Sequence, residues 1–133
     1  MKLSALKIDA AKLEKGDWVG DIPDLGDIRL KVRGIGNADH RRRRGELVAA
    51  LPRVQRKDVA ALDAIDVQLL VETILLGWEN VGDDDGVPIP YSADRAKELL
   101  SDPDLAVFRA GVIWAASVVA DRAEDSGEAD AGN

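Results

Sequence analysis

The middle of the chain, from Leu76 to Leu100, reads LGWENVGDDDGVPIPYSADRAKELL and combines several local signals in a definite order. Gly77 predicts the end of a helix, because glycine adopts left-handed dihedral angles without a side-chain clash. The acidic run 83–85 followed by Gly86 is typical of a turn, since aspartate carboxylates bond to nearby backbone amides. We therefore expect one helix to end near Gly77 and the chain to reverse through an acidic turn.

Two prolines and a serine shape the segment after this turn. Pro88 and Pro90 favour an extended backbone at the residues that precede them. Ser92 is then placed to cap a new helix, because its hydroxyl accepts a hydrogen bond from a free amide of the first turn. The pattern predicts an extended segment and then a helix over about 92–101.

The segments before the turn predict a hairpin and two helices. Alternation of apolar and charged residues from Ile28 to Arg33 has the period of two that is typical of a half-buried strand, and it predicts a short β-hairpin over about 17–33. A helix over about 38–51 comes next, capped by Asn37 and ended by a proline. The next helix is expected over about 58–76. It is apolar around most of its surface, which is typical of a central helix.

The last helix is expected over about 103–122, and it carries more apolar surface than one core contact needs. Pro103 after an aspartate is a common helix start. One stripe of this helix contains Leu105, Phe108, Val112, Ala115 and Val119, and the adjacent stripe contains Val107, Gly111, Trp114 and Val118. Either one stripe faces the core while the other meets a partner, or both are buried between two layers. Exposed apolar area of that width is unusual on a monomer.

Together these signals predict a mainly helical α+β fold with a short N-terminal β-hairpin and about four helices. The 133 residues fit one domain, expected over 1–123. Residues 124–133 are acidic and small and contain glycine, so we expect a disordered tail. The chain has no cysteine, which excludes disulfides and thiolate metal sites.

Neither a secretory signal nor a membrane span is expected. Charged residues interrupt the N-terminal apolar residues early, and the weakly polar run 110–120 is shorter than the roughly 20 residues that cross a bilayer. We expect a soluble cytoplasmic protein without a membrane partner, in the host cytoplasm if a virus or prophage encodes it.

The formal net charge of −7 conceals a strong asymmetry along the chain. Residues 1–57 contain 14 Lys and Arg against 8 Asp and Glu, whereas residues 58–133 contain 4 against 17. Complementary fields of this kind steer partners together and favour head-to-tail self-association. The alternative is that the two halves neutralise each other within one fold.

Several weak motifs, taken in order, resemble the tail assembly chaperones of long-tailed bacteriophages. The residues that carry the resemblance are Trp78–Val81 and Pro90–Ser92 around the acidic turn, and Trp18-Val19, Ile28–Arg33 and Gly36-Asn37 nearer the N-terminus. The resemblance covers roughly residues 15–120. It implies a non-enzymatic protein that binds the tape measure protein and assists polymerisation of the tail tube, whose subunit is a second expected partner.

The residues that would bind such a partner are inferred from amphipathicity rather than from the resemblance. The hypothesis combines the outer stripe of the last helix with the apolar end of the helix before the acidic turn, giving Val107, Trp114, Val118, Leu70, Ile74 and Trp78. Apolar grooves and weak multivalent contacts suit a chaperone of this kind, and no catalytic group is needed. We also expect the protein to form a homo-oligomer.

A run of four arginines, Arg41, Arg42, Arg43 and Arg44, is the strongest electrostatic feature. Cations in the first turns of a helix oppose the helix dipole, so something is expected to compensate them. The candidates are acidic residues of this chain, acidic residues of a partner, and a phosphate backbone. Nucleic acid is the least favoured, because the chain is acidic overall and the nearest aromatic residue is Trp18.

The sequence gives no support to an enzyme, a cofactor or a metal site. His40 is the single histidine, and no Ser-His-Asp arrangement can be built convincingly with it. The acidic turn fails as an EF-hand, because Val81 and Ser92 occupy positions that need Asp and Glu. The alternatives to a chaperone are a structural virion component, such as a head–tail connector or minor tail protein, and a nucleic-acid-binding regulator that uses Arg41–Arg44.

Overall fold

The computed structural model describes residues 1–132, with side chains described for residues 1–127. The fold is α+β and mainly helical, as expected. Its elements are the short helix η1 (Leu3–Leu6), α1 (Ala10–Lys15), β1 (Asp17–Val19), β2 (Arg29–Val32), α2 (Ala38–Ala50), η2 (Arg53–Gln55), α3 (Val59–Leu69), the π-helical turn η3 (Leu70–Ile74), β3 (Leu75–Glu79), α4 (Ala93–Ser101), η4 (Pro103–Leu105) and α5 (Ala106–Gly132).

The strands form one antiparallel sheet in the order β1-β2-β3. The expected hairpin over 17–33 is confirmed, with Trp18 opposite Lys31. The third strand was not expected. The helix predicted over 58–76 ends earlier, and the residues from Leu75 onward pair with the free edge of β2, so that Trp78 lies opposite Leu30.

The predicted helix end at Gly77 is therefore wrong, because Gly77 lies inside β3. The helix instead ends through the π-helical turn η3, after which Leu75 adopts an extended backbone with φ −76° and ψ 120°. Strand pairing gives the amides and carbonyls of Leu75–Glu79 hydrogen-bond partners. At a frayed helix end the same groups would stay unpaired. The change from helix to strand is hidden in the sequence by an unbroken apolar run.

The sequence correctly predicts where four helices start. A side-chain oxygen accepts a hydrogen bond from the backbone amide two or three residues further on at each start, and the four capping residues are Asn37, Asp58, Ser92 and Asp102. The acidic turn is also confirmed. Gly86 adopts a positive φ of 79°, and the carboxylate of Asp83 accepts from the amides of Asp85 and Val87.

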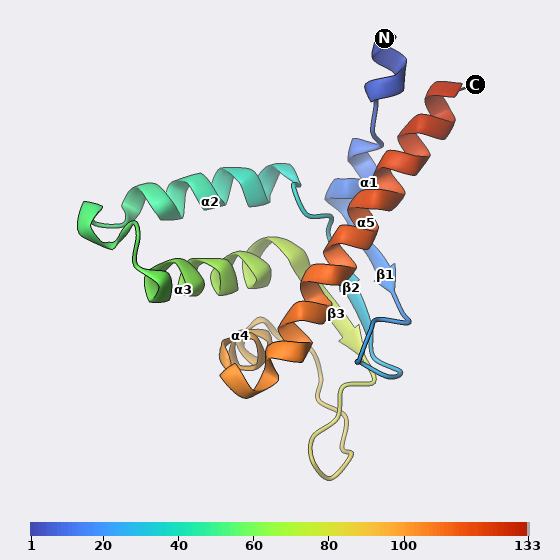
Figure 1. The fold of residues 1–133 in the computed structure, drawn as a ribbon. Coiled ribbons are helices and arrows are strands. Elements are labelled where there is room, and N and C mark those ends of the chain that lie inside the picture. Colours follow the sequence, from blue (N-terminus) through green and yellow to red (C-terminus); the bar gives the residue numbers. More distant parts are fainter. Residues whose placement is uncertain (133) are drawn as a thin grey trace.

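Helix α5 packs across the sheet and spans the molecule (Figure 1). The inner stripe expected to face the core does so, since Phe108, Val112, Ala115 and Val119 are buried. They meet the inward side chains of the sheet, including Leu30 and Val32, which are fully buried. This layer of one helix on three strands holds most of the hydrophobic core.

Helix α5 also continues beyond its predicted end near residue 122, as far as Gly132, where a disordered tail was expected. The N-terminal segment, which gave no clear signal in the sequence, supplies contacts for this extension. The amide of Asp9 donates to the carbonyl of Ala123 at 2.8 Å, and the Ser126 hydroxyl bonds to the Asp9 carboxylate at 3.1 Å. Asn133, the last residue of the predicted tail, lies outside the described residues.

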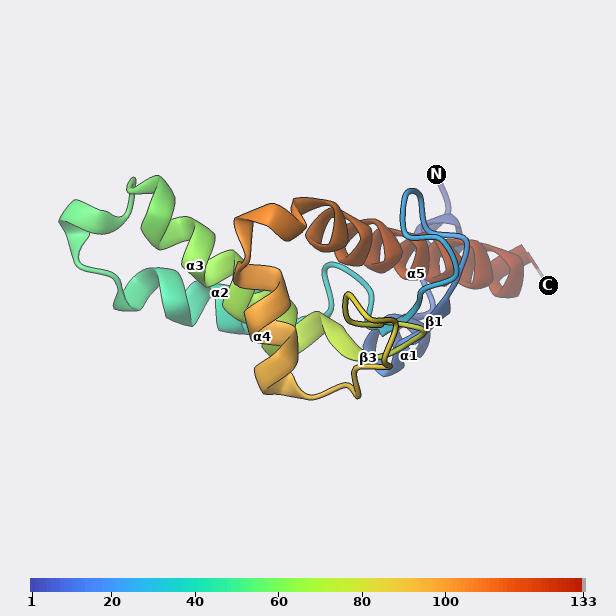
Figure 2. The same ribbon diagram turned by 90° about the horizontal axis from the view of Figure 1, so that it is seen from below.

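Helices α2 and α3 form an antiparallel arm that projects from the sheet and α5 (Figures 1 and 2). No residue of α2 is buried, and α3 has buried residues only from Ile65 onward. The turn η2 forms the outer end of the arm. This part of the chain therefore contributes mostly surface rather than core.

Asn37 joins the arm to the sheet. Its side chain is fully buried, and its amide nitrogen donates to the carbonyls of Gly34 at 3.0 Å and Thr73 at 2.9 Å. Its side-chain oxygen accepts from the amide of His40 and so caps α2. One side chain thus connects the exit of β2, the turn before β3 and the start of α2.

We predict that Asn37→Ala destabilises the protein by about 3 kcal/mol, because it removes a helix cap and the two buried side-chain hydrogen bonds to the carbonyls of Gly34 and Thr73. Ser92→Ala is the matched control, since it removes only the cap of α4 and should cost about 1 kcal/mol. Urea unfolding followed by circular dichroism measures both values. Equal losses in the two variants would show that the buried bonds of Asn37 contribute little.

Candidate functional site

The six residues predicted to bind a partner do not form one surface. Leu70, Ile74 and Trp78 are buried. The Trp78 indole donates to the carbonyl of Ile89 at 2.7 Å, and its ring packs edge-on against Phe108 with centroids 6.1 Å apart. These three residues therefore belong to the core in this structure.

The remaining three residues lie on α5. Val118 is partly buried against the core, whereas Val107 is 54% exposed and Trp114 is 40% exposed. Ile113 is also 40% exposed and was not singled out in the sequence. Its position opposite the inner stripe was the signal that could have identified it. Val107, Ile113 and Trp114 together form the α5 face.

An apolar groove adjoins the α5 face at Val107. It has a volume of about 470 Å³ and lies between the β1–β2 loop, the acidic turn, α4 and the start of α5. The apolar residues that line it are Leu25, Ile28, Val81, Ile89, Leu99, Leu105, Val107 and Phe108. Gly82 and three aspartates, Asp83, Asp84 and Asp104, complete its lining, and the aspartates make it acidic.

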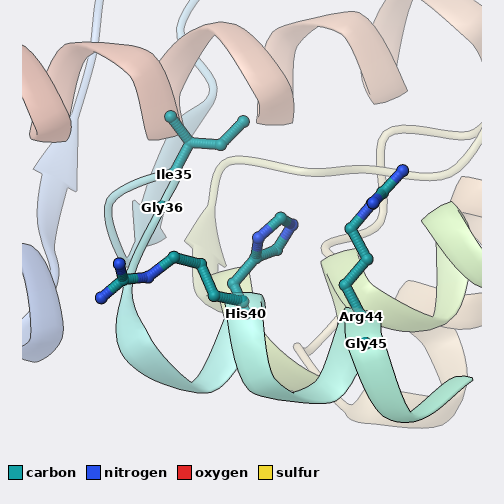
Figure 3. Close-up of a pocket in the computed structure, with 6 residues that line it drawn as sticks. Ile35, Gly36, His40, Arg44 and Gly45 are labelled. Atoms are coloured by element: carbon teal, nitrogen blue, oxygen red, sulfur yellow. The ribbon is translucent and has the colours of Figure 1, made fainter.

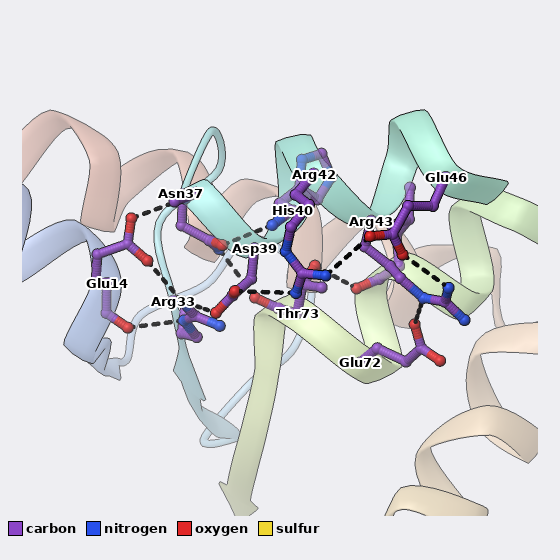
Figure 4. Close-up of polar contacts among 12 residues, drawn as sticks. Glu14, Arg33, Asn37, Asp39, His40, Arg42, Arg43, Glu46, Glu72 and Thr73 are labelled. Atoms are coloured by element: carbon purple, nitrogen blue, oxygen red, sulfur yellow. Dashed lines mark hydrogen bonds and ion pairs between the residues drawn. The ribbon is translucent and has the colours of Figure 1, made fainter. Parts of the chain in front are cut away.

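Two of the four arginines in the run are compensated within the chain (Figure 4). Arg42 pairs with Asp39 and with Glu46 at 3.0 Å, and Arg43 pairs with Glu46 and with Glu72 at 2.8 Å. Acidic residues of the same chain, one of the three candidates from the sequence, thus meet half of the charge. The network continues from Asp39 to Arg33 at 2.9 Å.

These ion pairs shift the acidity of the carboxyl groups. Hydrogen bonds from Arg43 lower the pKa of Glu46 and of Glu72, and a hydrogen bond from Arg33 lowers the pKa of Asp39. The carboxylates are largely exposed, so solvent screens each pair. The network therefore favours the ionised form of these three carboxyl groups and adds only modestly to the stability of the fold.

The other two arginines, Arg41 and Arg44, take part in no ion pair among residues 1–127. They line an open pocket of about 500 Å³ with Ile35, Gly36, His40 and Gly45 (Figure 3). Partial burial, together with the charge of Arg44, lowers the pKa of His40. The pocket is therefore cationic mainly through its two arginines, and His40 is half-buried rather than a free surface residue.

The segment Pro103–Gly127 is long and apolar enough, by length and composition, to cross a membrane. This differs from the expectation based on the shorter run 110–120. One third of its most apolar window is buried inside the protein, where the inner stripe packs on the sheet. The central helix of a globular core has the same length and composition.

The fold and its surfaces define a small α+β protein with a projecting charged arm, an exposed apolar helix face and an acidic apolar groove. A family model described as "YdaY prophage protein" matches residues 35–133, which is about three quarters of the chain. The chain belongs to this prophage protein family and is phage-derived. No curated protein and no solved structure matches it.

We predict that Glu72→Gln removes a contribution to stability that depends on pH. Because the folded-state pKa of Glu72 is lowered, its stabilisation is complete above the ordinary value of 4.5 and is lost as the pH falls through the lowered value. The difference in unfolding free energy between wild type and variant should therefore be constant near neutral pH and shrink below pH 4.5. It should also decrease with added salt.

Urea titrations over a series of pH values measure this difference. Glu124→Gln is the control, because Glu124 forms no ion pair or hydrogen bond among the described side chains and should show no such trend. A difference for Glu72→Gln that persists unchanged at low pH would mean that the Arg43–Glu72 pair does not contribute.

Proposed function

We propose that this prophage-derived protein is a tail assembly chaperone, a non-enzymatic factor that binds the tape measure protein in the host cytoplasm and assists tail tube polymerisation. The resemblance of its hairpin and acidic-turn motifs to that class supports the proposal. Membership in a prophage family agrees with it. A chaperone of this kind needs a surface that binds apolar side chains weakly and repeatedly along a long client.

The α5 face is the observation that carries the proposal. Val107 and Trp114 are seven residues apart on α5, two turns from each other, and Gly111 between them is buried beside Leu25. Ile113, which precedes Trp114, is also exposed and widens this surface around the helix. Aromatic residues at such positions commonly act as binding anchors, and the spacing suits the apolar stripe of an amphipathic client helix.

The opposite side of α5 explains why this surface is available. The inner stripe fixes the helix on the sheet, and the buried Phe108 packs on Trp78 and fixes its first turns. The α5 face is therefore held rigidly without contributing to the core. A rigid apolar surface binds a client with little loss of its own conformational freedom.

We predict that Trp114→Asp weakens binding to the tape measure protein of the same prophage about tenfold or more, while it changes the melting temperature little, because an exposed anchor contributes to binding rather than folding. The measurement is a pull-down and titration of purified variants against a tape measure fragment. Leu6→Asp is the control, since Leu6 is 61% exposed and lies outside the α5 face. A collapse of the melting temperature in Trp114→Asp would place Trp114 in the core instead.

We also predict that co-expression raises the soluble yield of the tape measure protein, because the α5 face covers apolar client surface that otherwise aggregates. Trp114→Asp should lose this effect and Leu6→Asp should keep it. Purified virions should lack the protein. Its presence there in stoichiometric amounts would favour a structural virion component.

A further inference from the structure

The outer end of the arm carries exposed apolar and basic side chains together. Val54 is 88% exposed and Val59 is 80% exposed, which are among the highest values of the large apolar residues. Between and beside them lie Arg53, Arg56 and Lys57, none of which forms an ion pair among residues 1–127. These residues, 53–59, are called the arm tip.

The arm tip is fixed rather than loosely attached. Two carbonyls at the end of α2, those of Ala49 and Leu51, accept from the Arg56 guanidinium at 3.4 and 3.3 Å. The Asp58 carboxylate caps α3 through the amide of Ala60. The two valines are therefore presented on a short, structured turn between two helices, and little order has to be gained when they are covered.

The apolar groove is complementary to the arm tip in both polarity and charge. Its lining is apolar except at Asp83, Asp84 and Asp104, none of which forms an ion pair among the described side chains. Three acidic residues at the groove thus face a tip that carries three basic residues, of which Arg56 also bonds to the α2 carbonyls, and one acidic residue, Asp58. Its volume of about 470 Å³ lies in the range of protein binding pockets and has room for a few side chains.

The arm tip cannot reach the groove of its own chain. In two perpendicular views, η2 lies at the far end of the arm, away from the acidic turn and the start of α5 (Figures 1 and 2). A contact between tip and groove must therefore join two copies. We propose that the arm tip of one copy docks in the apolar groove of a second copy, with Val54 inserted and the basic residues facing the aspartates.

Such a contact uses different surfaces on the two copies, so the pair keeps one free tip and one free groove. Contacts of this type produce open chains, or closed rings where the rotation between copies allows closure. Only the few side chains of the arm tip enter the groove, so the affinity should be low and should fall as salt screens the charges. This inference goes beyond the proposed function, and its test needs no client.

The test is sedimentation velocity of the full chain over a wide range of protein concentration at low salt. We expect wild type to associate as the concentration rises, to a closed dimer where two copies dock in each other's grooves and to larger species otherwise. Val54→Asp and the double variant Asp84→Lys/Asp104→Lys should each weaken this association about tenfold or more. Both sites are exposed, so folding should be unaffected. Leu3→Asp, at a residue that is 81% exposed and remote from both surfaces, should associate like wild type.

Mixing the two variants gives the decisive result. Val54→Asp keeps an intact groove and the double variant keeps an intact tip, so an equimolar mixture should form a one-to-one dimer and nothing larger. A wild type that stays monomeric throughout would overturn the proposal. So would association that neither variant weakens, or a mixture that remains monomeric while wild type associates.

Discussion

The buried amide of Asn37 is the constraint on which the arrangement of the molecule depends. Its nitrogen donates to the carbonyl of Gly34, just after β2, and to that of Thr73, just before β3. Its oxygen accepts from the amide of His40 and so caps α2. A buried amide with all these partners tolerates only one relative position of arm and sheet, because any shift would leave a polar group unpaired. This side chain, together with the ion pairs of Asp39 and Arg43, holds the start of the arm on the sheet.

The charge asymmetry of the chain is resolved in two different ways within this arrangement. Close to the sheet, Arg33 and Arg42 pair with acidic residues of their own half of the chain, whereas Arg43 pairs across the halves with Glu72. At the arm tip and around the groove, the basic and the acidic side chains form no ion pair among the described residues and face solvent. The asymmetry is therefore partly neutralised within the fold, while steering of partners and head-to-tail association through the remaining charges stay predictions.

The features that local chemistry dictates were predictable from the sequence. Asn37, Ser92 and Asp102 cap helices as their residue types suggest, the Asp83–Gly86 turn forms, and the inner stripe of α5 is buried. Period-two alternation also identified β2 correctly. In each of these cases the signal lies within a few residues of the structure that it specifies.

The errors come from contacts between distant segments. Leu75–Glu79 becomes a strand because β2 offers it a free edge, and no local pattern records that partner. Helix α5 passes its predicted end because the N-terminal segment packs beside it. Leu70, Ile74 and Trp78 were candidate binding residues because amphipathicity shows that a residue is apolar and does not show which layer covers it. The groove could not be predicted either, because four segments that are distant in the sequence come together to line it.

The packing of the N-terminal segment on the distal part of α5 has a practical consequence. The first residues of the chain and the far end of α5 lie at the same end of the molecule, away from the arm tip (Figures 1 and 2). Fluorophores or purification handles at either terminus would therefore leave the outer end of the arm unobstructed. The neighbouring ends also make the chain a candidate for circular permutation, in which a short linker joins them and new ends open in an exposed loop.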